Sequence, residues 1–339
     1  MPLTYSVAQG AFLPALAIRH PRELTPENIL PEFGLRAEPR GAAAPRDDRP
    51  VELELRRVDA ARGLDIGPFD YPRLEKRFAG PRPSLSFDLA GIRFRPMEGS
   101  TLWLADSVPQ DSFYFKSLLQ TLLTHAAAVG GSAVMHSGLI EWRGRGYLLV
   151  GDSGSGKSSL CVFSLLCGAR LVSDDVVTLA HDGDRFAGRG LRAYSLLRPG
   201  TREALPERLR RLTTTVTAEE GPKHLLRLES LGERVLEQCT IDAIVLPSVG
   251  TVVDNAAAAG YALATVSKAA AIARLMHCLD DRALLPGLDA ERAAVSELII
   301  ALVRALPCVE IRTSPRFLTE PARCATHLLS TLSRRIAHA

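Results

Sequence analysis

The chain has 339 residues, of which 46% are hydrophobic and 23% charged, and its 41 basic side chains exceed its 38 acidic ones by a net charge of +3. This composition is typical of a folded globular protein and excludes global disorder. The charge is too balanced for a protein that coats nucleic acid or an anionic membrane, and no apolar run reaches the ~18 residues of a spanning helix. We therefore expect a cytoplasmic protein that binds neither.

The N-terminal apolar run 11–18 is short, is interrupted by Pro14 and follows no basic segment, so we expect no signal peptide. The six cysteines include no CxxC pair and no zinc-finger spacing, and we expect them to be reduced and mostly buried. Lysine is rare, with five among the 41 basic residues. A lysine inside a motif is therefore more informative here than an arginine.

The first third of the chain shows the period-two alternation of half-buried strands. Apolar and polar residues alternate over 51–56, 85–89, 92–94 and 102–104. The stretch 36–50 is dominated by Pro, Ala, Gly and charged residues, which is typical of a loop or linker. We predict a mainly β N-terminal region over residues 1–112, in which no residue carries evident chemistry.

From residue 113 the pattern becomes that of an α/β core. The first helix is expected to end at Gly130-Gly131, and two apolar runs around Arg143-Gly144-Arg145-Gly146 predict a hairpin. The remaining expected elements are a helix over 157–167 capped by Gly168, strands over 170–173, 176–179 and 241–247, helices over 267–280 and 290–305, a strand over 308–312 and a closing helix over 319–336. We assign residues 113–339 to this domain.

The segment 147–160 reads YLLVGDSGSGKSSL and matches the pattern G-x-x-x-x-G-K-[ST]. Its glycines let backbone N–H groups converge on a polyphosphate, and the following helix points its positive N-terminus at the same place. Lys157 would neutralise the β- and γ-phosphates, and the Ser158 hydroxyl would ligate Mg²⁺. The predicted nucleotide-binding residues are Gly151, Asp152, Ser153, Gly154, Ser155, Gly156, Lys157, Ser158 and Ser159. Such a loop binds the phosphates and not the base, so the nucleotide could be either ATP or GTP.

Two adjacent carboxylates, Asp174 and Asp175, follow the predicted strand 170–173. P-loop enzymes hold Mg²⁺ with a carboxylate at the end of a strand that neighbours the strand before the loop, and we expect that neighbour relation here. Successive side chains of a strand point to opposite faces. One carboxylate would therefore reach the metal, and the other would reach the incoming nucleophile.

Several other residues have suitable chemistry without a decisive pattern. His136 lies on the first strand of the predicted hairpin, and its position alone is more typical of a core histidine. Arg189, Arg192 and Arg198 could clamp a phosphate or an acidic substrate, but in a chain this rich in arginine we interpret them as solvated surface. Lys223 is notable mainly because lysine is rare.

The stretch from His136 to Asp175 resembles, without gaps, the catalytic core of the HPr kinase/phosphorylase family of P-loop protein-serine kinases. The resemblance is carried by the histidine, the segment HSGLIEWRGRGYLLV, the loop GDSGSGKS, Gly168 and LVSDDVV. It implies that Asp174 takes the proton of the target serine hydroxyl. Asp175 is then a neighbour of the metal, and His136 lies beside the reacting phosphate.

The sequence also departs from that family. Its members carry a signature of the form E-x-R-G-L-G downstream of the aspartates, whereas the nearest fragment here, Arg189-Gly190-Leu191-Arg192, lies closer to Asp174 and lacks the glutamate. This departure counts against phosphorylase activity and against HPr itself as the substrate. The chain is more similar to the divergent branch that includes serine kinases of peptide natural products, such as those of lasso-peptide clusters.

We therefore predict an ATP-dependent, Mg²⁺-requiring kinase that transfers the γ-phosphoryl group to a hydroxyl, with Asp174, His136 and Lys157 as catalytic residues and Ser158 and Asp175 near the metal. The expected acceptor is a serine of a peptide or protein, for example a natural-product precursor peptide. The alternatives are a kinase of small hydroxylated metabolites and a slow ATPase that acts as a nucleotide-responsive binding module. The resemblance also points to a homo-oligomer, which no sequence feature demands.

Overall fold

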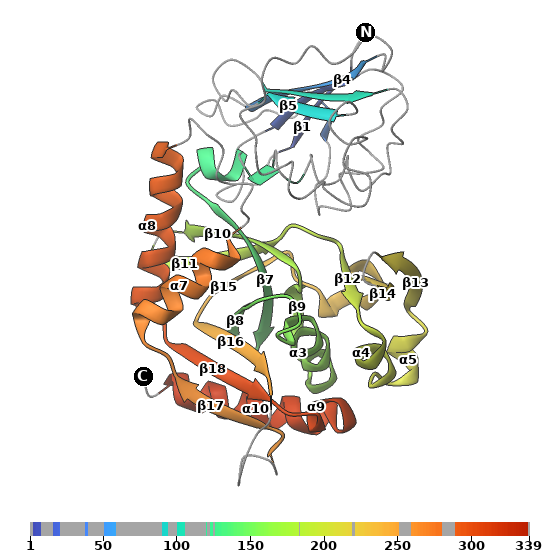
Figure 1. Ribbon diagram of the computed structural model, residues 1–339, viewed down its shortest axis with the longest axis vertical. Helices are drawn as coiled ribbons and strands as arrows, with labels where there is room; N and C mark the ends of the chain where they lie inside the picture. The colour runs from blue at the N-terminus through green and yellow to red at the C-terminus, as the bar shows by residue number, and fades with distance from the viewer. Residues whose placement is uncertain are drawn as a thin grey trace. The chain divides into compact units, whose positions relative to one another are not determined.

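A computed structural model (Figure 1) describes most of the chain from residue 126 onward and six strands before it. The described residues are 3–7, 16–20, 38–39, 51–58, 90–93, 100–105, 120, 123–124, 126–182, 184–218, 221–250, 259–279 and 289–337. The chain divides into two compact units, Met1–Ser132 with Asp281–Val295 and Ala133–Asp280 with Ser296–Ala339. The boundary that we predict at residue 112 stays a prediction, because it falls outside the described residues.

The first unit contains a six-stranded mixed sheet in the order β3-β1-β2-β4-β6-β5. Its strands are β1 (Leu3–Val7), β2 (Leu16–His20), β3 (Glu38–Pro39), β4 (Val51–Val58), β5 (Ala90–Arg93) and β6 (Ser100–Ala105). The predicted strands at 51–56, 92–94 and 102–104 are confirmed as β4, β5 and β6, whereas 85–89 lies outside the described residues.

One prediction for this unit is wrong in part. Glu38 and Pro39, inside the predicted linker 36–50, form β3 and pair antiparallel with β1. Two residues are too few to show an alternation, and a proline is tolerated because β3 is an edge strand. Further along, residues 126–129 are helical and the chain turns at Gly130 and Gly131, as predicted.

The second unit is built around a nine-stranded mixed sheet, and the predicted α/β fold is confirmed. The strand order is β15-β11-β10-β7-β8-β16-β18-β17, with β9 also paired to β7. The strands are β7 (Ala133–Trp142), β8 (Arg145–Val150), β9 (Arg170–Ser173), β10 (Val176–Asp182), β11 (Arg185–Gly190), β15 (Gln238–Thr240), β16 (Ala243–Val249), β17 (Tyr261–Thr265) and β18 (Cys308–Thr313). The predicted hairpin is β7–β8, closed by Arg143 and Gly144 with positive φ angles.

Helices line this sheet as the periodicity predicts. They are α3 (Lys157–Ser164), continued by the 3₁₀ turn η6 (Leu165–Cys167), then α7 (Lys268–Cys278), α8 (Asp289–Ala305), α9 (Arg316–Thr319) and α10 (Pro321–Ala337). α3 contacts both α10 and β7, and a shared core of side chains such as Leu149, Phe163 and Leu328 fixes its position. The strand predicted at 241–247 is β16, shifted by two residues.

The segment between β11 and β15 contains elements that we did not predict. A small antiparallel sheet has the order β12-β14-β13, formed by β12 (Tyr194–Leu197), β13 (Thr213–Ala218) and β14 (Gly221–Arg227). Three short helical segments accompany it: α4 (Pro199–Glu203), α5 (Glu207–Arg210) and η7 (Leu228–Arg234). In Figure 1 this subdomain lies beside α3, on the side away from α7 and α8.

Two further expectations can be compared with the structure. All six cysteines are free thiols and four of them are buried, as predicted. Among the described residues, no helix has the length and apolar content needed to cross a bilayer.

Candidate active site

The glycine-rich loop connects β8 to α3, the strand–loop–helix context that its pattern requires. Gly154 and Gly156 have φ angles of +84° and +93°, which L side chains rarely adopt. Gly156 is the N-cap of α3, and its carbonyl accepts the first helical hydrogen bond, from the N–H of Leu160 at 2.9 Å. The N–H groups of the first helical turn, at Lys157 to Ser159, therefore have no partner within the helix and can bind an anion.

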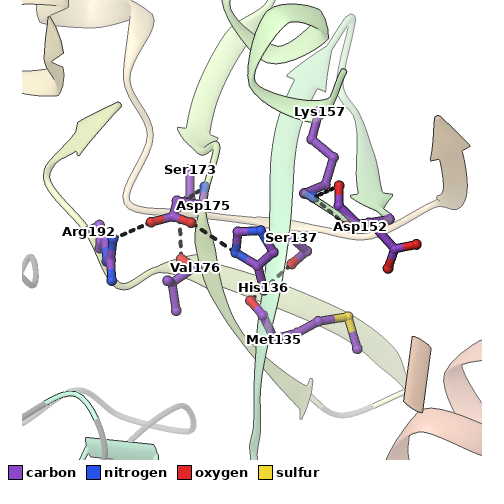
Figure 2. Close-up of polar contacts among 10 residues, drawn as sticks. Met135, His136, Ser137, Asp152, Lys157, Ser173, Asp175, Val176 and Arg192 are labelled. Carbon is purple, nitrogen blue, oxygen red and sulfur yellow. Dashed lines mark hydrogen bonds and ion pairs between the residues drawn. The ribbon is translucent and has the colours of Figure 1, made fainter. Parts of the chain in front are cut away.

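Lys157 lies folded against its own loop. Its Nζ donates to the carbonyl oxygens of Gly151 and of Asp152, the latter at 2.9 Å, and the residue is only 4% exposed (Figure 2). Burial lowers the pKa of Lys157, while nearby acidic groups, including Asp175, counteract that decrease. An ammonium group held in this way can exchange loop carbonyls for phosphate oxygens without moving far.

The other loop residues differ in exposure and contacts. Asp152 is exposed and its Oδ1 lies 3.3 Å from Nε2 of His277 on α7. Ser153 is exposed, while the hydroxyl of Ser155 is buried and has no hydrogen-bond partner among the described residues. The Ser159 hydroxyl lies 2.7 Å from that of Thr201 on α4.

The aspartate pair occupies an interruption between two strands that share one edge of β7. β9 pairs with β7 through Ser173 and Leu139, and β10 pairs with it through Val176 and His136. Asp174 and Asp175 form the bend between these two strands, where the Asp175 carbonyl accepts a hydrogen bond from the N–H of Ser137 at 3.0 Å. The irregularity in the pairing of β7 with β9 lies between Leu139 and Ile140. The expectation that the strand before the aspartates neighbours the loop strand is wrong, because β7 lies between β9 and β8.

Asp175 contacts a histidine and an arginine. Its Oδ1 lies 2.9 Å from Nδ1 of His136, and its Oδ2 accepts a hydrogen bond from Arg192 (Figure 2). Burial raises the pKa of Asp175, but Arg192 and His136 together outweigh it and hold that pKa well below the ordinary range. Both carboxylate oxygens of Asp175 are thus engaged, one by each of these groups.

Asp174 has the opposite environment. The residue is 2% exposed, and neither carboxylate oxygen has a hydrogen-bond partner among the described residues. Burial and the adjacent Asp175 charge raise its pKa to about 7, while nearby Ser195 and Ser158 counteract the increase. A buried carboxylate without partners is costly, so these two oxygens are poised to accept a ligand.

Ser158, with the carboxylate pair nearby, fits a magnesium ion. Mg²⁺ takes oxygen ligands and is usually bound by one or two protein groups together with phosphate oxygens and water. The Ser158 hydroxyl, beside the carboxylate pair, is an oxygen ligand of this kind. In the described part of the chain no cluster of three His, Cys, Asp or Glu side chains could hold a metal alone, so the nucleotide would have to complete the coordination.

The structure also places the residues that the sequence left unassigned. Our interpretation of Arg192 as solvated surface is wrong, because it is bonded to Asp175 and its side chain is 21% exposed. Arg189 lies 3.4 Å from the exposed Glu237, but its own side chain is only 17% exposed, so the same interpretation is wrong for Arg189. Arg198 is exposed, as interpreted, and Lys223 lies on β14 in the small sheet. Arg192 follows Gly190-Leu191 at the end of β11, and nothing in its own sequence context distinguishes it from the neighbouring arginines.

Comparison with known proteins gives one sequence relative. The chain is 30% identical over 116 residues to the HPr kinase/phosphorylase of Mycoplasmopsis pulmonis, a match that covers 30% of this chain and 37% of that protein. The chain therefore spans well under half the length of this curated relative. The structure of the Hpr(Ser) kinase/phosphatase from Coxiella burnetii is also similar, with a TM-score of 0.28 and 13% identity over 60% of this chain and 94% of that one. No protein-family model matches the chain.

Proposed function

Because the chain is HPr-kinase-like in sequence, we propose that it is an ATP-dependent kinase that transfers the γ-phosphoryl group to a hydroxyl. The acceptor would be a serine of a peptide or protein. The observation that carries this proposal is the pair of unpartnered, buried Asp174 oxygens near Ser158 at the start of α3. Burying a carboxylate without hydrogen-bond partners is energetically costly. An acceptor hydroxyl beside a bound triphosphate would be such a partner.

In this proposal the loop 151–158 wraps the triphosphate with its backbone N–H groups. Lys157 moves from the carbonyls of Gly151 and Asp152 to the β- and γ-phosphates and stabilises negative charge during transfer. Asp174 orients the acceptor hydroxyl and takes its proton. Because the Asp174 oxygens are inaccessible to solvent, the loop or the bend at Asp174 and Asp175 must shift when the acceptor binds.

Mg²⁺ would be held by Ser158 near the carboxylate pair, with Asp175 in its outer shell, and would supply charge neutralisation of the phosphates. Asp175 has a second task that does not depend on the metal. It fixes the imidazole of His136 through Nδ1, so that Nε2 is directed away from Asp175. His136 is 46% exposed, so its Nε2 could form a hydrogen bond with an incoming phosphate or peptide.

Incubation with γ-labelled ATP and three sets of acceptors tests the proposal. The acceptors are HPr, serine-containing peptides that include precursor peptides, and small hydroxylated metabolites. Label on a peptide or protein supports the proposal, and label on a metabolite would favour the small-molecule kinase. Release of free phosphate alone would favour a slow ATPase, and a short precursor-peptide gene beside this one would point to the peptide acceptor.

A further inference from the structure

A second cationic group lies at the tip of the glycine-rich loop. Both terminal guanidinium nitrogens of Arg198 are 3.9 Å from the point that a Cβ on Gly154 would occupy. Gly154 lies within the loop that would surround the triphosphate, so the guanidinium is within one side-chain movement of any phosphate bound there. Arg198 comes from the unpredicted segment between β11 and β15, and no function has been assigned to it so far.

The backbone of Arg198 is held firmly beside α3. Leu197 before it is 0% exposed, and Arg198 is the N-cap of α4, with Pro199 after it and its carbonyl bonded to the N–H of Arg202 at 3.1 Å. α4 is tied to α3 through the hydroxyls of Thr201 and Ser159, 2.7 Å apart. Since Ser159 directly follows the loop, the position of Arg198 is set by the same element that carries Lys157 and Ser158.

The neighbouring arginines bond to groups outside the glycine-rich loop. Arg192 is bonded to Asp175, Arg189 pairs with Glu237, and Nε of Arg202 donates to the Thr213 hydroxyl at 3.0 Å. The guanidinium of Arg198 lies beside the loop at Gly154. An arginine at that position can present two parallel N–H donors to a single phosphate.

We propose that Arg198 binds the terminal phosphate of the nucleotide and supplies, from within the same chain, the arginine that stabilises phosphoryl transfer. The inner phosphates of a bound triphosphate are already surrounded by loop N–H groups and by the helix N-terminus. The terminal phosphate alone carries three non-bridging oxygens and accepts a bidentate guanidinium while still meeting Lys157. This inference rests on the proposed function, because it requires a nucleotide in the loop.

Nucleotide affinity, measured without any acceptor, tests the role of Arg198. The affinities of Mg·ATP and Mg·ADP are measured by displacement of a fluorescent N-methylanthraniloyl-ADP, for the wild-type chain and for Arg198→Met. We expect Arg198→Met to lose about 10- to 100-fold in affinity for Mg·ATP, the loss typical of a charge-assisted bidentate contact. Its affinity for Mg·ADP should change by less than about threefold, which also shows that the loop remains folded.

Two further variants make the test specific. Arg198→Lys keeps the positive charge but loses the two parallel N–H donors, so its affinity for Mg·ATP should lie between those of wild type and Arg198→Met. Arg202→Met removes an arginine from the same short helix and should leave the ratio of ATP to ADP affinity unchanged. If wild type binds both nucleotides and Arg198→Met retains the wild-type ratio, the inference is overturned while the proposed function stands. If wild type binds neither nucleotide, both are overturned.

Discussion

His136 and Asp175 meet across two paired strands, with Nδ1 of the histidine 2.9 Å from Oδ1 of the aspartate. The contact follows from register, because His136 on β7 faces Val176, the residue after Asp175. Arg192 approaches the other carboxylate oxygen from the end of β11. Three segments of the chain thus converge on one partly buried carboxylate, next to the acid that we propose as the base.

Arg192→Met should destabilise the protein by about 1–3 kcal/mol at pH 7.5, because it leaves the Asp175 charge with His136 as its remaining partner. Arg192 holds the pKa of Asp175 low, so its stabilising effect is present above the unfolded pKa and is lost as the carboxyl becomes protonated. The penalty should therefore persist at pH 5, where the carboxyl is still ionised in both states, and become smaller at about pH 3, below the unfolded pKa of about 3.9, as measured by urea unfolding at the three pH values. The matched control is Arg211→Met, because both side chains of the Arg211–Glu207 pair are exposed and a cost within about 0.5 kcal/mol is expected. Equal penalties for the two variants would contradict this account.

Asp174 should make the protein less stable as the pH rises. Its folded pKa of about 7 lies above the unfolded value, so the folded state binds the extra proton and stability is lost between about pH 4 and pH 7. Within that window the loss approaches about 1.4 kcal/mol for each pH unit. Asp174→Asn removes the titration, and its melting temperature should therefore decrease less than that of wild type between pH 5 and pH 8. Parallel curves for the two proteins would show that Asp174 is ionised at little cost.

The same variant tests the proposed base. Asp174→Asn should keep the fold and bind Mg·ATP, but lose roughly 10²–10⁴-fold in transfer to whichever acceptor takes label from wild type. Calorimetric binding and transfer are to be measured on the same preparation. Unchanged turnover would remove Asp174 from the mechanism. Loss of Mg·ATP binding would instead make this carboxylate a direct metal ligand.

Gly190 should be required for the placement of the aspartates. A Cβ at this position would lie 2.4 Å from the carbonyl oxygen of Val172, a backbone atom of β9 that cannot rotate away. Gly190→Ala should therefore cost about 1–3 kcal/mol in unfolding free energy, the usual penalty for overpacking. Gly200→Ala is the control, because a Cβ there meets nothing within 4 Å. Similar stability of the two variants would show that β9 and β11 can separate easily.

The phosphate loop could be predicted from the sequence because its spacing is a local requirement. Gly154, Gly156 and Lys157 are close together in the sequence, so their spacing can be recognised without knowledge of the fold. The pairing of His136 with Asp175 could not be predicted, because it depends on the register of β7 with β10 and on the bend that separates β9 from β10. Those relations are set by pairing between segments that are distant in the sequence.

The arginines were missed for a related physical reason. Arg192 and Arg198 precede and follow β12, in a small sheet whose strand β13 reads TTTVTA and shows no alternation of apolar and polar residues. Such strands are specified mainly by their partners, here β14 on one side. Without that sheet there was no basis for placing the Arg192 guanidinium beside Asp175 or the Arg198 guanidinium beside Gly154.

Titration calorimetry with Mg·ATP tests the central claim, that a triphosphate binds in the loop 151–158, most directly. We expect heat that fits one site per chain for the wild-type protein. Lys157→Met should abolish that heat, whereas Lys223→Met, which removes a lysine from the small sheet, should not. Absence of heat with the wild-type protein and any magnesium nucleotide, or equal heat with Lys157→Met, would contradict the account.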